Sequence, residues 1–393
     1  MLNPDLTTLN DWMFGKLNNL LSDIKRGEKA ESFLLNIGEP QLSPPEIVKE
    51  TINKYHLDWR KYTPSNGLRE FRESVAHYIS RRYPNAKDLL DIDKEITAVP
   101  GTRAPLHQIG WIVRKGTNKQ TSLVTNPFYH AWRAGAVAAG TKIVWMDANK
   151  SNNYLPNPKI ISQKILDDSA LMYICTPSNP QGTSGSIEWL IEIINLCRKH
   201  KILLCVDECY ADIYRNNSSP PAGTLEALEK IGEGCNGVVV FHSLSKRSSV
   251  PGLRCGFMAG DHRIIGAYNL LTSNGGVCLS FPQLKAGEAL YMDDKHVQSN
   301  RSYYDKNFLI SKNILNHKTP SGGFFVFKRV KDDLIATKHL WKNFGVKVMP
   351  GSFMAANSIN NNPGSGFLRI ALVHDDNTTK KALNLVSKGL EEL

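Results

Sequence analysis

Residues 238–257 read VVVFHSLSKRSSVPGLRCGF, a stretch in which a β-branched run is followed closely by a lysine and then by an arginine. The run predicts a buried strand, and the small and turn-forming residues after it predict a turn. A lysine at the end of a rigid strand is suited to form a Schiff base with a carbonyl cofactor, and a phosphate on that cofactor needs hydroxyl and guanidinium donors nearby. Lys246 is therefore the candidate nucleophile, and Ser243, Ser245 and Arg254 are candidate phosphate donors.

This segment has two interpretations, and the exact order of its residues distinguishes between them. In the simpler one, Lys246 and Arg247 form a solvated basic loop. The order Ser-Leu-Ser-Lys-Arg-Ser-x-x-Pro-Gly-Leu-Arg-x-Gly, however, resembles the cofactor-lysine segment of class I and II aminotransferases, which are pyridoxal 5'-phosphate (PLP) enzymes of fold type I. Within that class it is most similar to the N-succinyldiaminopimelate aminotransferase group. The resemblance covers residues 36–372 and implies that Lys246 holds PLP.

Length and composition predict a soluble protein of two domains. The chain has 393 residues, 41% of them hydrophobic and 22% charged, and its 7 cysteines lack the spacing of a metal or redox site. Unpatterned cysteines predict reduced thiols in the cytoplasm, and we expect no metal. The first residues lack the apolar core of a secretory signal, and no apolar run approaches a membrane span, so we expect no membrane partner.

The formal net charge of +11 raises the question of a nucleic-acid partner. The lysines and arginines are spread along the chain, without a basic tail or interleaved aromatic residues. We therefore expect a generally basic surface that acts on small anionic substrates, and no nucleic-acid partner.

Alternating strand and helix patterns indicate an α/β fold. Helices are predicted at residues 102–113 and 187–197, and strands at residues 95–99, 122–125, 142–146, 170–174, 202–206, 238–241 and 255–259. Such repeats favour a mostly parallel central sheet with helices on both faces. A long helical region at residues 281–315 then precedes strands at residues 324–327, 346–349 and 367–371, which is typical of a smaller α+β domain. With the resemblance, this predicts the PLP-dependent transferase fold of type I.

The N-terminal pattern suggests an arm that belongs partly to the smaller domain. Apolar residues recur at a helical period over residues 6–25, and a short strand is predicted at residues 33–37. We expect residues 1–45 to form this arm and part of the small domain, residues 46–275 the large PLP-binding domain, and residues 276–393 the C-terminal small domain.

The turn at residues 100–103, Pro-Gly-Thr-Arg, joins a predicted strand to a predicted helix. Free backbone N–H groups and the helix dipole favour a phosphate at such a turn. The resemblance implies that Thr102 and Arg103 contact the PLP phosphate there. Ala104 stands where the family usually has a glutamate, so we expect no acidic role at that position.

Two further strand ends carry residues that the resemblance assigns to the cofactor. It implies that Tyr129 stacks on the pyridine ring, although an aromatic residue there is also typical of a core. It implies that Asn179, in Ser-Asn-Pro-Gln-Gly, donates a hydrogen bond to the phenolic oxygen of the cofactor, although a plain Asn-Pro turn is the alternative.

Asp207 ends another predicted strand, where a carboxylate either caps a helix or serves chemistry. A buried carboxylate beside a pyridine nitrogen raises the pKa of that nitrogen, and an electron sink needs the nitrogen protonated. The resemblance gives this role to Asp207, and contact with the phenolic oxygen to Tyr210. Strand ends at residues 126–129, 179, 207–210 and 243–246 should meet at the carboxyl edge of an open sheet.

Arg369 lies inside the apolar strand predicted at residues 367–371. A buried charge needs a partner, and a planar guanidinium binds a carboxylate bidentately. The resemblance implies that Arg369 holds the α-carboxylate of the substrate, with Gly38 and Asn179 as further substrate contacts. For Gly38, a plain Gly-Glu-Pro turn is the alternative.

The resemblance also predicts the assembly. In the family, a tyrosine before the helix that here begins near residue 68 reaches across the interface to the cofactor phosphate of the other subunit. Tyr62 occupies that position, although tyrosines in such loops are often simply packed. We expect a homodimer with shared active sites, and small-molecule amino acid and 2-oxo acid substrates as the other partners.

Together these features predict a PLP-dependent aminotransferase in which Lys246 is also the base that moves the α-proton. The expected reaction joins N-succinyl-L,L-2,6-diaminopimelate with 2-oxoglutarate, in lysine and diaminopimelate biosynthesis. The succinylated substrate brings two carboxylates besides the one at Arg369, and Arg103 and Arg247 lie near the loops where they would bind. The alternatives are an aspartate- or alanine-type aminotransferase of broader specificity and a PLP-dependent carbon-sulfur lyase.

Overall fold

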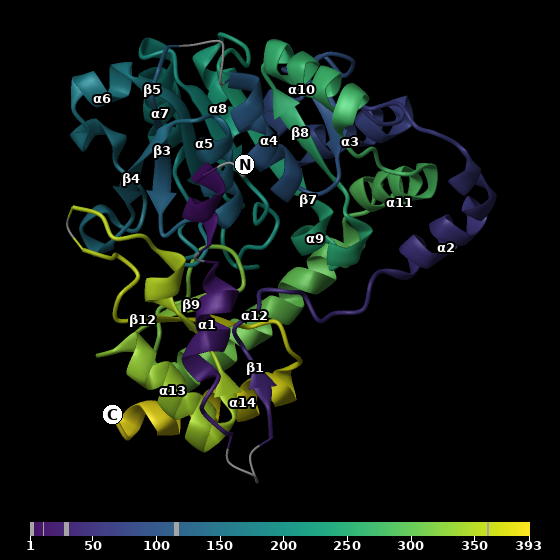
Figure 1. Ribbon diagram of the computed structural model, residues 1–393. Coiled ribbons are helices and arrows are strands. Elements are labelled where there is room, and N and C mark those ends of the chain that lie inside the picture. Colours follow the sequence, from purple (N-terminus) through teal and green to yellow (C-terminus); the bar gives the residue numbers. More distant parts are fainter. Residues whose placement is uncertain (1–3, 11, 27–30, 114–117, 360) are drawn as a thin grey trace.

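The computed structural model describes residues 4–10, 12–26, 31–113, 118–359 and 361–393. A large sheet covered by helices forms one part of the molecule, and a smaller unit with short strands lies beside it, joined by a long helix (Figure 1). The arm predicted at residues 6–25 includes residue 11, which lies outside the described residues. Around it the chain forms the 3-10 turn η1 (Pro4–Leu9) and the helix α1 (Met13–Leu21).

The large sheet has seven strands, and its order is β2-β8-β7-β6-β5-β3-β4. Their bounds are β2 (Ile96–Val99), β3 (Thr121–Asn126), β4 (Lys142–Asp147), β5 (Ser169–Cys175), β6 (Leu203–Asp207), β7 (Val238–Ser243) and β8 (Gly256–Gly260). The pairs from β7 to β4 are parallel, whereas β8 pairs antiparallel with both β7 and β2. The predicted mostly parallel sheet is confirmed.

Side chains of the central strands alternate between two buried cores. Leu204, Val206 and Val240 pack into one core, while Cys205 and Phe241 pack into the other. Both faces are therefore dry, which is why these strands read as nearly continuous apolar runs.

Helices cover both of these faces. The first core is covered by α3 (Arg69–Arg82), α7 (Ile187–Lys199), α8 (Thr224–Ile231) and α11 (Phe281–Met292). The second is covered by α4 (Arg103–Val113), α5 (His130–Ala138) and α10 (His262–Gly275). The remaining helices of this part are α2 (Glu46–Lys54), α6 (Gln163–Asp167) and α9 (Leu244–Arg247), with 3-10 turns η2 (His56–Arg60), η3 (Pro84–Ala86), η4 (Lys150–Asn152), η5 (Pro158–Ile160) and η6 (Pro251–Leu253).

The smaller unit is built from both ends of the chain. Its sheet has the order β11 (Met349–Pro350), β12 (Phe367–Ala371), β9 (Phe325–Arg329), and all its pairs are antiparallel. A separate parallel pair joins β1 (Phe33–Leu34) to β10 (Val346–Lys347). The helices α13 (Asp333–Phe344) and α14 (Asp376–Glu391) enclose their core, and α1 packs beside the 3-10 turn η7 (Gly351–Met354).

The helical region expected at residues 281–315 is two helices. α11 ends at Met292, and α12 (Lys295–Leu315) begins after two aspartates. α11 packs on α2 and α3 beside the large sheet, whereas α12 runs from the neighbourhood of α9 into the smaller unit and packs on α14 (Figure 1). The break at Asp293 and Asp294 therefore separates a helix of the large sheet from the helix that joins the two parts.

Candidate active site

A cavity of about 490 Å³ lies at the carboxyl ends of β6 and β7, against residues of the smaller unit. It brings together all the residues predicted to be catalytic or to contact the cofactor or the substrate α-carboxylate, except Tyr62. Those lining it are Gly38, Thr102, Arg103, Tyr129, Asn179, Asp207, Tyr210, Ser243, Ser245, Lys246, Arg254 and Arg369. The predicted convergence of strand ends is therefore observed.

Lys246 is presented to this cavity by the short helix that follows β7. The backbone N–H of Ser245 donates to the Ser243 hydroxyl at 3.2 Å, which caps the start of α9. The Nζ of Lys246 donates to the carbonyl oxygen of Gly38 at 2.6 Å. Burial lowers the pKa of Lys246 to about 8, so its amine is partly neutral near physiological pH.

Gly38 is required where Lys246 meets it. A Cβ at this position would lie 2.4 Å from Cζ of Phe325, closer than side-chain atoms approach. Any larger residue must therefore displace the carbonyl that receives the lysine or the ring behind it.

Asp207, the last residue of β6, is a nearly buried carboxylate, with 6% of its surface exposed. Burial raises the pKa of Asp207, and the backbone N–H of Cys209, which donates to it at 3.2 Å, acts in the opposite direction. Tyr210 lies edge-on to Phe324 and Phe325, and burial raises the pKa of its phenol well above the usual range. The phenol is therefore a neutral donor at this wall.

Arg369 on β12 is a guanidinium whose partners are neutral. It is 2% exposed, donates from Nη2 to the carbonyl oxygen of Asn36 at 2.7 Å, and donates from Nη1 to Oδ1 of Asn179 at 3.3 Å. Its Nε is also buried and has no hydrogen-bond partner among the described residues. Burial lowers the pKa of Arg369 to about 10, so it stays charged and suits an entering carboxylate.

Another part of the cavity lining is suited to a phosphate. The turn before α4 exposes the first backbone N–H groups of that helix, and the hydroxyls of Ser243 and Ser245 line the same space. Arg254 donates from Nη1 to the carbonyl oxygen of Pro251 at 2.9 Å. A Cβ on Gly101 would lie 2.2 Å from Nη2 of Arg254, so the guanidinium closes over this turn because the residue is glycine.

These groups fit the cofactor that the sequence predicts. The glycine turn and Arg254 form an anion cradle, and Asp207 and Lys246 supply a buried carboxylate and an amine to the same cavity. Tyr129 lines the same space, and its hydroxyl accepts a hydrogen bond from Nε of Arg103 at 3.1 Å. PLP would be held by its phosphate at the cradle and by its ring between Tyr129 and Asp207.

Two sequence expectations fall outside the cavity. Tyr62 is fully exposed and does not line it. The suggestion that Arg247 is available to a substrate is wrong, because its side chain is buried and forms ion pairs with Asp212 and Asp294. Among the described residues, no cluster of three or more histidine, cysteine, aspartate or glutamate side chains is arranged to hold a metal.

The cavity also contains residues that the sequence reasoning missed. Met13 and Phe14 reach it from α1, and Glu39 and His130 line its walls. Burial lowers the pKa of His130 to about 4, so this imidazole is neutral at physiological pH. The helical period of the N-terminal arm signalled that one face of it packs on the protein, but not that this face meets the cavity.

Comparisons with known proteins agree with this geometry. The family model for aminotransferase class I and II matches residues 30–386. A solved aminotransferase from Neisseria meningitidis is 31% identical, with a TM-score of 0.94 over 99% of this chain and 100% of that one. The aminotransferase AspB from Helicobacter pylori is 30% identical, with a TM-score of 0.90 over the whole of both chains. The LL-diaminopimelate aminotransferase of Maridesulfovibrio salexigens is 25% identical over 98% of this chain and 97% of that protein.

Proposed function

Because the chain belongs to the class I and II aminotransferases, which depend on PLP, we propose that it transfers an amino group from a diaminopimelate derivative to 2-oxoglutarate. The proposed donor is N-succinyl-L,L-2,6-diaminopimelate, because the sequence motif around Lys246 resembles that of the N-succinyldiaminopimelate aminotransferase group. One observation carries the proposal: an amine, a buried carboxylate and a buried guanidinium, from Lys246, Asp207 and Arg369, line a single cavity.

In this proposal Arg369 binds the α-carboxylate of the substrate through its unpartnered Nε and its outer N–H groups. Asn179 and the backbone at Asn36 fix the plane of that guanidinium. The carboxylate of Asp207 would keep the ring nitrogen of bound PLP protonated. When bound, PLP supplies the electron-accepting ring that makes the α-proton of the substrate acidic.

Lys246 performs the proton transfer. A base must be neutral before it accepts a proton, and the lowered pKa of about 8 keeps part of the Lys246 amine neutral at physiological pH. The carbonyl of Gly38 orients this amine, and Phe325 and Tyr210 line the cavity with it. Nζ of Lys246 would take the proton from the α-carbon of the substrate and hold it for return to the same face of the bound molecule.

Charge at the mouth of the cavity favours the succinylated donor. Arg103 is an exposed cation there, and Glu39 and Asp207 are the carboxylates among the described lining residues. Because Asp207 is buried and Arg103 is exposed, we assign the distal end of the substrate to the side of the cavity lined by Arg103. The distal end of the succinylated donor carries two carboxylates, whereas that of free LL-diaminopimelate is a zwitterion, so an exposed cation supports the former as the donor.

A second candidate donor is LL-diaminopimelate itself. Relatives such as the Maridesulfovibrio salexigens enzyme carry that name, and Glu39 offers a carboxylate to its distal ammonium group. Glu39 should therefore attract the distal ammonium group of LL-diaminopimelate and repel the distal carboxylates of the succinylated donor.

We propose further that the active unit is a homodimer, with Tyr62 completing the partner's cofactor site. Supporting this are large apolar side chains exposed on neighbouring segments, which a second copy would cover. Examples are Leu57 and Trp59 on η2, Trp111 on α4, and Leu270 and Val277 around the end of α10. The described chain carries no disulfide, which suits the proposed cytoplasmic location, and none of its helices combines the length and apolar character needed to cross a bilayer.

The test is a donor panel with purified enzyme, 2-oxoglutarate and PLP, in which glutamate is measured for both diaminopimelate compounds, aspartate and alanine. We expect the highest kcat/KM with N-succinyl-L,L-2,6-diaminopimelate and no activity in Lys246→Ala. A higher kcat/KM with aspartate or alanine would overturn the substrate assignment only. Release of pyruvate and ammonia from a cysteine thioether, without glutamate, would identify a carbon-sulfur lyase.

A further inference from the structure

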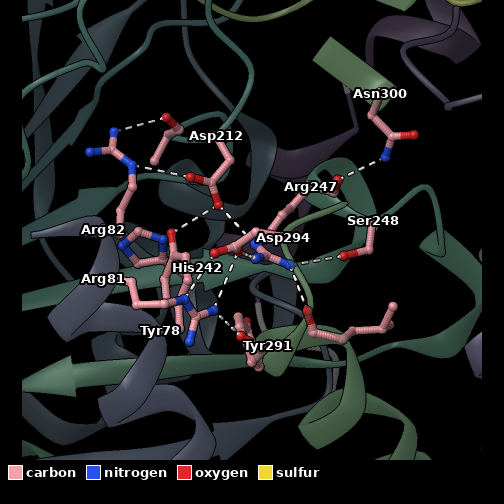
Figure 2. A network of polar contacts seen from close by, with 12 residues as sticks. Tyr78, Arg81, Arg82, Asp212, His242, Arg247, Ser248, Tyr291, Asp294 and Asn300 are labelled. Carbon is pink, nitrogen blue, oxygen red and sulfur yellow. Dashed lines mark hydrogen bonds and ion pairs between the residues drawn. The ribbon is translucent and has the colours of Figure 1, made fainter. Parts of the chain in front are cut away.

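We propose that Arg247 is a positioning residue, which holds the turn carrying Lys246 against the start of α12 and so keeps the lysine in register with Arg369. The inference rests on the proposed function only in taking Lys246 as the reacting amine. Arg247 lines no part of the cavity, and its side chain belongs to a buried polar network (Figure 2).

All the N–H groups of the Arg247 guanidinium are engaged. Nε donates to Oδ2 of Asp212 at 2.9 Å, and Nη2 donates to Oδ1 of Asp294 at 2.7 Å. The remaining donors meet the Leu290 carbonyl at 2.8 Å and, at longer range, the Asp293 carbonyl and the Ser248 hydroxyl. A guanidinium has five such donors in a fixed plane, so this set of partners determines where the residue next to Lys246 lies.

The network forms a line of alternating charges in which Arg247 is central. Asp212 lies between Arg82 and Arg247, and Asp294 lies between Arg81 and Arg247 (Figure 2). Arg81 and Arg82 both belong to α3, which packs on the large sheet. The line therefore ties α9 and the start of α12 to the rigid part of the protein.

Further bonds join the same turn directly to α12. Asn300 donates to the carbonyl oxygen of Arg247 at 2.9 Å, and the ring of His296 contacts the Ser248 hydroxyl at 2.8 Å. These contacts flank the nucleophile on its C-terminal side. Movement of the first turns of α12 would therefore move the backbone that carries Lys246.

The later turns of α12 hold the strand that carries Arg369. Tyr303 donates to the Val373 carbonyl at 3.0 Å, and Asn307 donates to the carbonyls of Leu372 and His374 at 3.1 and 2.7 Å. These carbonyls follow β12 immediately. The helix α12 thus links the turn that carries Lys246 to the strand that carries Arg369. Arg247 provides the ionic contact at the N-terminal end of this helix, through Asp294.

The test uses Arg247→Met in the PLP-loaded enzyme. The variant should fold, because each aspartate still has an ion-pair partner: Asp212 still pairs with Arg82, and Asp294 still pairs with Arg81. A released turn displaces Lys246, so we expect kcat to fall at least about tenfold while KM changes less than about threefold. Arg81→Met is the matched control, because it removes an outer arginine of the same line and leaves every bond of Arg247 in place.

A second readout needs no substrate. The visible absorption of the loaded enzyme titrates with protonation of the nitrogen that Lys246 contributes. The groups whose charges act on Lys246 are Cys209, Arg369, Glu39 and Arg254, and none of them is altered in these variants. A released turn admits water, which favours the protonated form, so the midpoint should rise by about half a pH unit or more in Arg247→Met. It should stay unchanged in Arg81→Met, and Arg247→Lys should give an intermediate value.

The outcomes separate the two proposals. An unchanged kcat and midpoint in Arg247→Met, or equal changes in Arg81→Met, would overturn the positioning role. A wild-type protein without a visible band that depends on Lys246 would instead overturn the proposed function. If Arg247→Met does not fold, Asn300→Ala removes the bond to the Arg247 carbonyl and should raise the midpoint in the same direction, whereas an unchanged midpoint would contradict the inference.

Discussion

The Nζ of Lys246 lies 2.6 Å from the carbonyl oxygen of Gly38, although 208 positions separate the two residues. The contact joins the turn after β7 to the segment after β1, so the N-terminal part of the chain forms a wall of the candidate active site. The Lys246 amine is therefore oriented by backbone as well as by side chains.

Gly38→Ala should disturb this wall. Its Cβ would meet the Phe325 ring at 2.4 Å, so the Gly38 carbonyl must shift away from Lys246. We expect kcat/KM to fall at least about tenfold, measured by glutamate formation. Gly266→Ala on α10 is the control, because its Cβ meets nothing within 4 Å and its activity should match the wild type. Wild-type activity in Gly38→Ala would show that the hydrogen bond between Lys246 and the Gly38 carbonyl does not contribute to catalysis.

The rate should depend on pH through Lys246. Its pKa is lowered from the usual lysine value to about 8, and only the neutral amine accepts a proton. We therefore expect kcat to rise with pH, by about tenfold per unit well below the pKa, and to level off above about pH 8. Steady-state rates at saturating substrate from about pH 6 to about pH 9.5 would measure this. A kcat that falls over that range would contradict the assignment.

Asp207→Asn should show whether the negative charge of Asp207, and not only the shape of its side chain, is needed for activity. The amide fills nearly the same volume, so the melting temperature should change little, but the negative charge beside the ring nitrogen is lost. We expect kcat to fall by about 100-fold or more, equivalent to about 2.7 kcal/mol. Asp88→Asn is a suitable control, because the Asp88 side chain is 87% exposed. An Asp207→Asn enzyme of normal rate would remove this carboxylate from the mechanism.

Arg369→Lys should weaken binding of the α-carboxylate. The lysine keeps a positive charge but cannot form the bidentate contact of a planar guanidinium, and it leaves Asn36 and Asn179 without their donor. We expect KM for the amino donor to rise by about tenfold or more. Arg329→Lys, at the exposed end of β9, should leave KM unchanged. Equal KM values in wild type and Arg369→Lys would refute the anchoring role.

Glu39→Gln should change the choice between donors. Removing this carboxylate relieves repulsion of the distal carboxylates in N-succinyl-L,L-2,6-diaminopimelate and removes a partner for the ammonium group of LL-diaminopimelate. The ratio of kcat/KM between the two should shift toward the succinylated compound by about two- to fivefold, the usual weight of an exposed charge pair. Competition between both donors in one reaction gives this ratio directly. A shift toward LL-diaminopimelate would place Glu39 elsewhere in the recognition of substrate.

Much of the fold was predictable because its signals are local. The run of valines at the start of β7, the arginine inside β12 and the glycine turn before α4 each carry their own pattern, and each lies where it was expected. The meeting of these residues followed from the rule that parallel strands end at one edge of a sheet.

The misses have long-range causes. A helical region was expected over residues 281–315 without a break inside it, whereas α11 and α12 are separated at Asp293 and Asp294, and the carboxylate of Asp294 pairs with Arg81 and Arg247 from distant segments. For the same reason the sequence could not show that Arg247 is buried.

The pairing of β1 with β10 has a consequence for synthesis of the protein. Phe33 aligns with Val346, and the backbone N–H of Ala371 donates to the Leu35 carbonyl at 2.8 Å. The first strand to be synthesised therefore cannot form its backbone hydrogen bonds until the last strands have been synthesised. During translation the wall at Gly38 cannot be completed until β12 has emerged from the ribosome. A nascent or truncated chain that lacks its last strands therefore has an incomplete active-site wall and leaves the backbone of residues 33–35 without these partners.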